Sequence, residues 1–180
     1  MIQPDIWSFS SKALMSWMAA YAVWEPISYK VFPALFKAAT TQEYYNPRKF
    51  SFGVVAAGDF LYSTLILLVA QQVIAYVFKS EGAKDMFEWA KRLLVFLGVQ
   101  WVSDLSFYGF VKSLPDAWTP RYLDFFKRYG AQVGLGAPIG DSLYGIVWLS
   151  LTQWMATHVP DWIQLFLIVA FLFMTLVVPF

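Results

Sequence analysis

Two long apolar segments of this 180-residue chain each begin with the same short motif, which contains one acid. Residues 58–62 read Gly-Asp-Phe-Leu-Tyr and precede the apolar run 63–78, and residues 140–144 read Gly-Asp-Ser-Leu-Tyr before a second run. A helix needs about 20 mainly apolar residues to cross a bilayer. The pattern therefore predicts membrane-spanning helices, two of which carry an aspartate near their start.

The composition supports a bilayer as the surrounding solvent. Hydrophobic residues make up 59% of the chain and charged residues 14%, whereas soluble domains carry about 25% charged residues. A chain of this size has too little interior to bury that much apolar surface. The net charge of +1 gives no basic field for nucleic acid, and the absence of cysteine excludes disulfides and thiolate metal sites.

We expect an all-α integral membrane bundle with four transmembrane helices at about 50–78, 93–111, 140–157 and 162–180. Residues 1–49 form a separate N-terminal region of amphipathic interfacial helices, and 50–180 form the bundle. Glu25-Pro26 is expected to end a helix that begins near Ala13. The alternative is a fifth, proline-kinked span over 13–36, which would bury Glu25 and Lys30 at a cost of a few kcal/mol each.

The distribution of Lys and Arg indicates an orientation. With four spans, nine of these residues fall on the side of residues 1–49 and 112–130, and four fall on the other side. This bias predicts that both termini face the cytoplasm. With five spans the counts become seven and five, which gives little preference.

The two motifs also suggest an internal repeat. Aligning Gly58 with Gly140 matches five residues over 14 positions, the last pair being Gln71 and Gln153. The repeat unit would be a helical hairpin, covering 50–111 and 131–180. Two spans per unit would give the copies the same orientation in the membrane.

Three acids within or beside the apolar segments are the candidate functional residues. Each is followed one helical turn later by a tyrosine, and one is also preceded by a glutamine: Asp59 with Tyr62, Asp104 with Tyr108 and Gln100, and Asp141 with Tyr144. A charge in hydrocarbon is costly, so such groups mark a site or a buried pair. They predict a polar core that holds a cation, relays protons or locks helices together. Alternatively, Asp59 and Asp141 are helix N-caps, and Asp104 pairs with a base or with nearby hydroxyls.

Basic and aromatic residues alternate in the connectors 43–49 and 115–129, which indicates surfaces that dock other protein subunits. The candidate docking residues are Arg48, Lys49, Trp118, Arg121, Lys127 and Arg128. One histidine supports no metal cluster, and no phosphate loop, nucleophile motif or dinucleotide fingerprint occurs. We therefore expect no cofactor, no bound metal and no enzymatic activity.

The repeated motif in a small, aromatic-rich, multi-span chain resembles the multi-span membrane proteins in the virions of large icosahedral DNA viruses. The resemblance covers residues 58–62 and 140–144 and implies a structural role at an internal virion membrane. We expect an assembly protein that anchors partner subunits at a membrane. The alternative is a small proton- or cation-coupled transporter or channel subunit that uses the intramembrane aspartates.

Overall fold

The computed structural model describes residues 6–79 and 82–177, apart from the side chain of Trp118. Within these ranges the chain is helical and contains no strand, which confirms the all-α class. The helices are α1 (Ser11–Leu35), α2 (Ala39–Tyr44), α3 (Phe52–Phe78), α4 (Met86–Ser113), α5 (Arg121–Val133), α6 (Gly136–His158) and α7 (Asp161–Val177), with a 3-10 turn at Asp116–Trp118.

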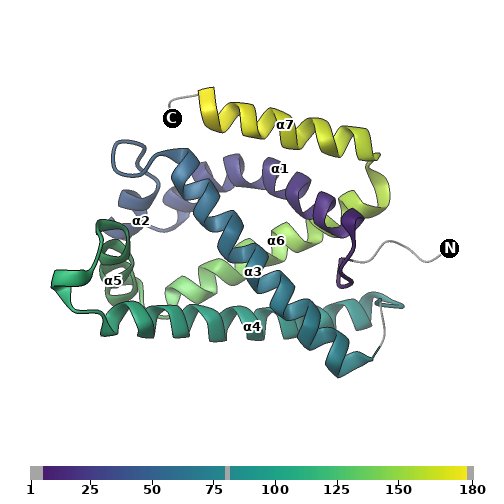
Figure 1. Cartoon of the computed structure of the whole chain (residues 1–180), viewed down its shortest axis with the longest axis horizontal. Coiled ribbons are helices and arrows are strands. Elements are labelled where there is room, and N and C mark those ends of the chain that lie inside the picture. Colours follow the sequence, from purple (N-terminus) through teal and green to yellow (C-terminus); the bar gives the residue numbers. More distant parts are fainter. Residues whose placement is uncertain (1–5, 80–81, 178–180) are drawn as a thin grey trace.

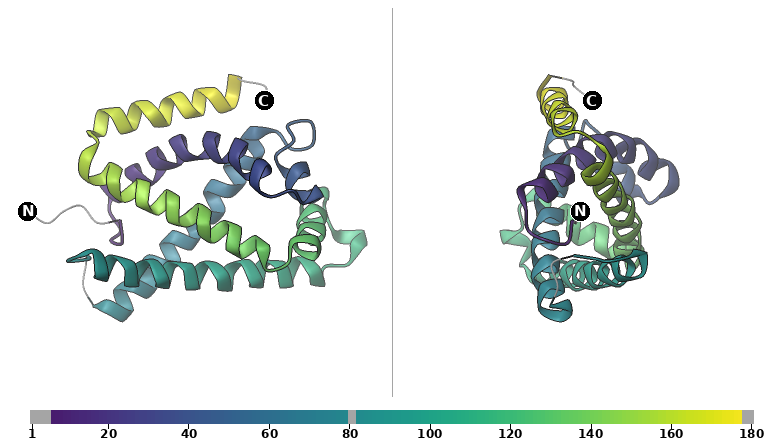
Figure 2. Two further views of the ribbon diagram at one scale, coloured as in Figure 1. Left: turned by 180° about the vertical axis from the view of Figure 1, so that it is seen from behind. Right: turned by 90° about the vertical axis from the view of Figure 1, so that its right-hand side faces the viewer.

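Five long helices run between two ends of the molecule, and the short helices α2 and α5 gather at one of these ends (Figure 1). Helices α3 and α4 pack directly on each other, whereas α1 packs against both α6 and α7 and lies between them (Figure 2). In the first expected hairpin α3 and α4 therefore contact each other directly, whereas in the second α1 lies between α6 and α7. The described start and end of the chain lie at opposite ends of the bundle.

Helix α1 is continuous, so the expected helix end at Glu25-Pro26 was wrong. The helix passes through Pro26 and Pro33, although a proline inside a helix costs about 3 kcal/mol because it removes a backbone hydrogen bond. Trp17 stacks on a ring of α6, and Tyr21 contacts a ring of α7. Burial of this aromatic face against two neighbours offsets the cost of the prolines, and tertiary packing decides where the helix ends.

Two other helices begin earlier than the sequence predicts. Helix α4 starts at Met86 rather than near residue 93, because the Asp85 carboxylate accepts from the Glu88 N–H at 2.8 Å and Glu88 accepts from the Lys84 N–H at 2.9 Å. This reciprocal arrangement is close to a capping box. Helix α6 starts at Gly136 and carries Pro138 in its first turn, where a missing N–H costs nothing.

Helices α3 and α4 are long and apolar enough to cross a membrane. Only 28% of the apolar window of α3 and 17% of that of α4 is buried inside the protein, so neither resembles the enclosed core helix of a soluble domain. Helix α7 is apolar but has 17 residues, and residues 178–180 of the expected fourth span lie outside the described part. Length and composition therefore support two spans, and four are not established.

Two stacked tryptophans form the centre of the core. The rings of Trp17 in α1 and Trp148 in α6 lie 3.6 Å apart between centroids, with 13° between their planes, and both are fully buried. The Trp148 indole N–H donates to the backbone oxygen of Trp17 at 2.9 Å, and the Trp17 indole donates to Thr64 Oγ1 at 3.0 Å. The stack therefore joins α1 to both α6 and α3.

Helix α5 meets α4 at a glycine. A Cβ atom at Gly130 would overlap the ring of Tyr108, whereas a Cβ at Gly109, one residue further along α4, would meet nothing within 4 Å. We expect Gly130→Ala to lower the free energy of unfolding by about 1–2 kcal/mol through overpacking. Gly109→Ala should raise it by about 0.5–1 kcal/mol because alanine favours helix. Titration with SDS in mixed micelles measures both, and equal effects would contradict the close packing of α5 on α4.

Candidate functional site

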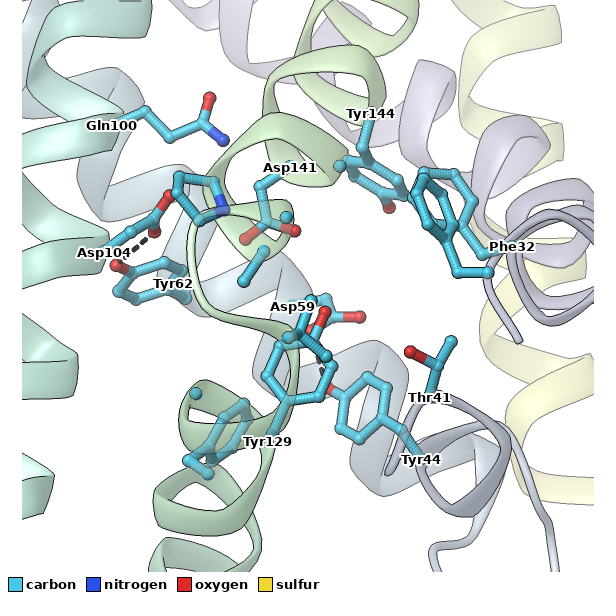
Figure 3. Close-up of a pocket in the computed structure, with 18 of the residues that line it drawn as sticks. Phe32, Thr41, Tyr44, Asp59, Tyr62, Gln100, Asp104, Tyr129, Asp141 and Tyr144 are labelled. Carbon is cyan, nitrogen blue, oxygen red and sulfur yellow. Dashed lines mark hydrogen bonds between the residues drawn. The ribbon is translucent and has the colours of Figure 1, made fainter. Parts of the chain in front are cut away.

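A cavity of about 680 Å³ lies between α1, α2, α3, α4, α5 and α6, toward the end of the bundle where α2 and α5 gather. All seven of the polar intramembrane candidates are on its wall: Asp59, Asp104, Asp141, Tyr62, Tyr108, Tyr144 and Gln100. Figure 3 shows the three aspartates directed toward one shared space from three different helices. These residues therefore line one shared cavity.

Helix capping does not account for Asp59 or Asp141. Asp59 lies seven residues after the first residue of α3, whose N-cap is Ser51, and Asp141 lies five residues after the first residue of α6, whose N-cap position is Leu135. Both carboxyl groups are therefore inside helices, where the backbone N–H groups are already bonded. Asp141 is exposed to the cavity, whereas Asp59 is partly buried.

Tyrosines donate to these carboxyl groups from other helices rather than from the same helix. Tyr44 of α2 donates to Asp59 at 2.7 Å, and Tyr62 of α3 donates to Asp104 at 2.8 Å. The spacing of three or four residues does place acid and phenol on one face, but the Tyr62 and Tyr144 hydroxyl groups donate to acids of other helices. Within residues 6–79 and 82–177 Asp104 forms no ion pair with a base, and the hydroxyl group that donates to it belongs to α3.

A fourth carboxyl group, Glu25, was not among the predicted site residues, although the alternative span over 13–36 would bury it. It is fully buried in α1 and accepts hydrogen bonds from Tyr144 of α6 at 2.6 Å and from Ser28 at 3.2 Å. The signal was present, because Glu25 continues the helical face marked by Trp17 and Tyr21 at intervals of four residues. The proline that follows it concealed this continuity.

The inner end of the cavity is closed by aromatic rings. Trp17 and Trp148 belong to its wall, and their stacked rings are fully buried. Toward the other end the wall includes Leu35 and Leu135, which are 67% and 61% exposed. Leu105 of α4, which is 48% exposed, also belongs to the wall, so the cavity is enclosed at the tryptophan stack and open to the protein surface elsewhere.

Two of the candidate docking residues hold the α2–α5 end together. Arg128 of α5 donates to both carboxylate oxygens of Glu43 in α2, at 2.9 and 3.1 Å, and Lys127 pairs with Asp116 at 2.7 Å. The remaining described candidates, Arg48, Lys49 and Arg121, are exposed, and no ion pair is found for them within the described residues. The Trp118 side chain lies outside the described part.

At the turn from α5 into α6, Gly134 has a φ of +56°, which an L side chain rarely adopts.

Acid should loosen the contact between α2 and α5. The pKa of Glu43 is lowered, mainly by the hydrogen bonds from Arg128 and also by the charges of Lys49 and Arg121. A lowered folded-state pKa gives stability that is present above the unfolded value of about 4.3 and is lost as pH falls through the folded-state pKa.

A fluorophore on Ala131→Cys, the sole cysteine of that variant, reports on this contact through its anisotropy. We expect the anisotropy to fall between about pH 5 and pH 3. Arg128→Met should give a low anisotropy already at neutral pH, with a smaller change on acidification. An identical pH profile in both proteins would show that the Glu43 ion pair does not hold α5.

No group of three His, Asp or Glu side chains that could hold a metal ion occurs within residues 6–79 and 82–177. Comparison with protein-family models, curated proteins and solved structures finds no match to this chain. The resemblance to virion membrane proteins is therefore neither supported nor refuted by a relative. The functional assignment depends on the site itself.

Proposed function

We propose that this protein is a multi-pass membrane protein that binds a small cation in this cavity. Three helices support the placement of this protein in a bilayer. Helices α3 and α4 are long and apolar enough to cross it, and α7 has an apolar surface on which Trp162 is 72% and Leu176 is 85% exposed. A cavity of about 680 Å³ falls within the range of about 300–1,000 Å³ that is typical of sites for small molecules.

The charge of the cavity wall is the observation that carries this proposal. Three aspartates line the cavity, against a single base, Lys37, among the described residues. Carboxyl groups placed in an apolar bundle are costly and generally serve a ligand or a pathway. Fifteen of the lining residues are aromatic, and aromatic faces attract cations. The wall therefore suits a positively charged solute with an apolar body.

We further infer that α1 crosses the membrane together with α3, α4, α6 and α7. Its 25 residues give a length of about 37 Å at 1.5 Å per residue, and it packs between two of the other long helices. Five crossings would place the two termini on opposite sides, in place of the shared cytoplasmic side that the Lys and Arg count predicts. Labelling of single cysteines introduced at each end, in sealed vesicles, distinguishes the two arrangements.

Calorimetric titration of the purified protein in nanodiscs tests cation binding. Phenethylammonium and trimethyl(phenethyl)ammonium are suitable probes because each joins one positive charge to one ring. We expect saturable binding of at least one probe, and an affinity at least tenfold lower in the triple variant Asp59→Asn/Asp104→Asn/Asp141→Asn, since a hydrogen bond or contact to a charged group contributes about 1.5–3 kcal/mol. If the triple variant does not fold, the affinity is measured for the three single Asp→Asn variants instead.

Asp161→Asn is the matched control, because Asp161 pairs with Lys12 at the opposite end of the bundle. It should bind as the unmodified protein does. Failure of both probes to bind saturably, or equal loss of binding in this control, would overturn the proposal. Faster uptake of a bound probe into vesicles that contain the protein than into empty vesicles would extend binding to transport.

A structural role in assembly at a membrane is a second proposal, and the virion membrane named by the resemblance is one such setting. It is favoured by Arg48, Lys49 and Arg121, which leave an exposed basic surface at the α2–α5 end. Replacing all three by glutamine should release partner subunits that co-purify in mild detergent without changing cation binding. Intact co-purification would argue against docking through this surface.

A further inference from the structure

The cavity wall presents hydrogen-bond acceptors that lack donors. Asp104 Oδ1 accepts from Tyr62, but its second oxygen, Oδ2, is buried without a partner. Gln100 lies one helical turn earlier on the same face of α4, is 4% exposed, and its Oε1 also has no partner. Buried acceptors are rarely left unsatisfied in proteins, because an unpaired buried polar group has a free-energy cost. A ligand or water that supplies N–H or O–H donors would remove this cost.

Three of the tyrosine hydroxyl groups on the wall are already engaged. The hydroxyl groups of Tyr44, Tyr62 and Tyr144 each donate to a carboxyl group. The one lining base, Lys37, is exposed and donates to a backbone oxygen of α1 at 3.4 Å. These donors are not available to a ligand, whereas Asp104 Oδ2 and Gln100 Oε1 on α4 are unpartnered acceptors, which favours a ligand that brings donors to α4.

The arrangement of the carboxyl groups also favours an organic cation over a bare metal ion. The described acidic and histidine side chains form no cluster close enough to coordinate one ion. The aspartates are instead distributed around a space large enough for a molecule of drug size, among rings such as Phe32, Tyr129 and Tyr144. An extended apolar body would contact these rings while one charged group reaches α4.

We infer that this cavity selects a protonated primary or secondary amine with an aromatic or aliphatic body, and that Asp104 and Gln100 accept its N–H groups. This inference rests on the proposed function and names the ligand class of the same site. A quaternary ammonium group has the same charge but no N–H donor, so it would leave both acceptors unpaired. An aminophospholipid offers the same amine, but it would bring its phosphate among the aspartates.

Comparison of the two probes in phosphatidylcholine nanodiscs tests the inference. Phenethylammonium should bind at least tenfold more tightly than trimethyl(phenethyl)ammonium. Gln100→Leu should reduce this preference at least threefold while retaining binding of the quaternary probe, because Leu keeps the apolar volume and removes the acceptor. Gln72→Leu, an exposed glutamine of α3 outside the cavity, should leave the preference unchanged.

The outcomes separate this inference from the proposed function. Equal affinities for the two probes, or a preference that Gln100→Leu does not alter, would overturn the inference but leave cation binding in place. Absence of saturable binding by either probe would overturn both. Competition by phosphatidylethanolamine added to the nanodiscs would support the amine class and identify a lipid headgroup as its source, and lack of competition would identify a dissolved amine.

Discussion

Replacement of Trp148 by alanine is expected to lower the free energy of unfolding by about 3–5 kcal/mol, which is the usual cost of removing a fully buried tryptophan. Trp148 has no exposed surface, stacks on Trp17 and contacts Tyr21 at 4.7 Å between ring centroids. Its removal would also open the inner end of the cavity. Titration with SDS in mixed micelles, followed by far-ultraviolet circular dichroism, measures the change.

Trp162→Ala is the matched control for this substitution. Trp162 is 72% exposed on α7, so its replacement should change the free energy of unfolding by less than about 0.5 kcal/mol. Trp148→Phe should fall between the two variants, because it keeps a ring in the stack and loses the indole N–H bond to α1. Similar losses for Trp148→Ala and Trp162→Ala would show that the stack is not the centre of the core.

Helical periodicity and length were sufficient to predict much of the fold. The apolar runs located α3, α6 and α7 to within a few residues, because long apolar segments admit few alternatives. Helix ends were harder to predict. The end at Glu25-Pro26 failed because packing on two neighbouring helices outweighs a local preference, and the start of α4 was missed because the cap at Asp85 lies outside the apolar run.

The candidate site was predictable in its members and not in its pairings. An acid and a phenol one turn apart must share a helix face, so residues such as Asp104 and Tyr108 could be assigned to one polar surface. Which phenol meets which acid depends on helix order and crossing geometry, and periodicity carries no information on either. This is why Tyr62 was placed with Asp59 and bonds Asp104 instead, and why the partner of Glu25 was not foreseen.

Gln164 illustrates the same limit in the expected fourth span. Its side chain is fully buried in α7 and accepts from Ser16 of α1 at 2.9 Å. Its amide nitrogen donates to the backbone oxygens of Met155 and Val159 at 2.9 and 2.8 Å, where α6 ends. The Met155 oxygen also accepts from the Val159 N–H. One glutamine thus connects α1, α6 and α7.

Gln164→Leu should lower the free energy of unfolding by about 2–4 kcal/mol, because it keeps the volume but leaves the Ser16 hydroxyl and the Val159 carbonyl without their partner, at about 1–3 kcal/mol each. Gln72→Leu makes the same exchange at an exposed position of α3 and should change that free energy by less than about 0.5 kcal/mol. SDS titration of both variants provides the comparison. If Gln164→Leu proved as stable as the unmodified protein, leucine would pack equally well there. Helix α7 would then be held to α1 and α6 by apolar contact alone.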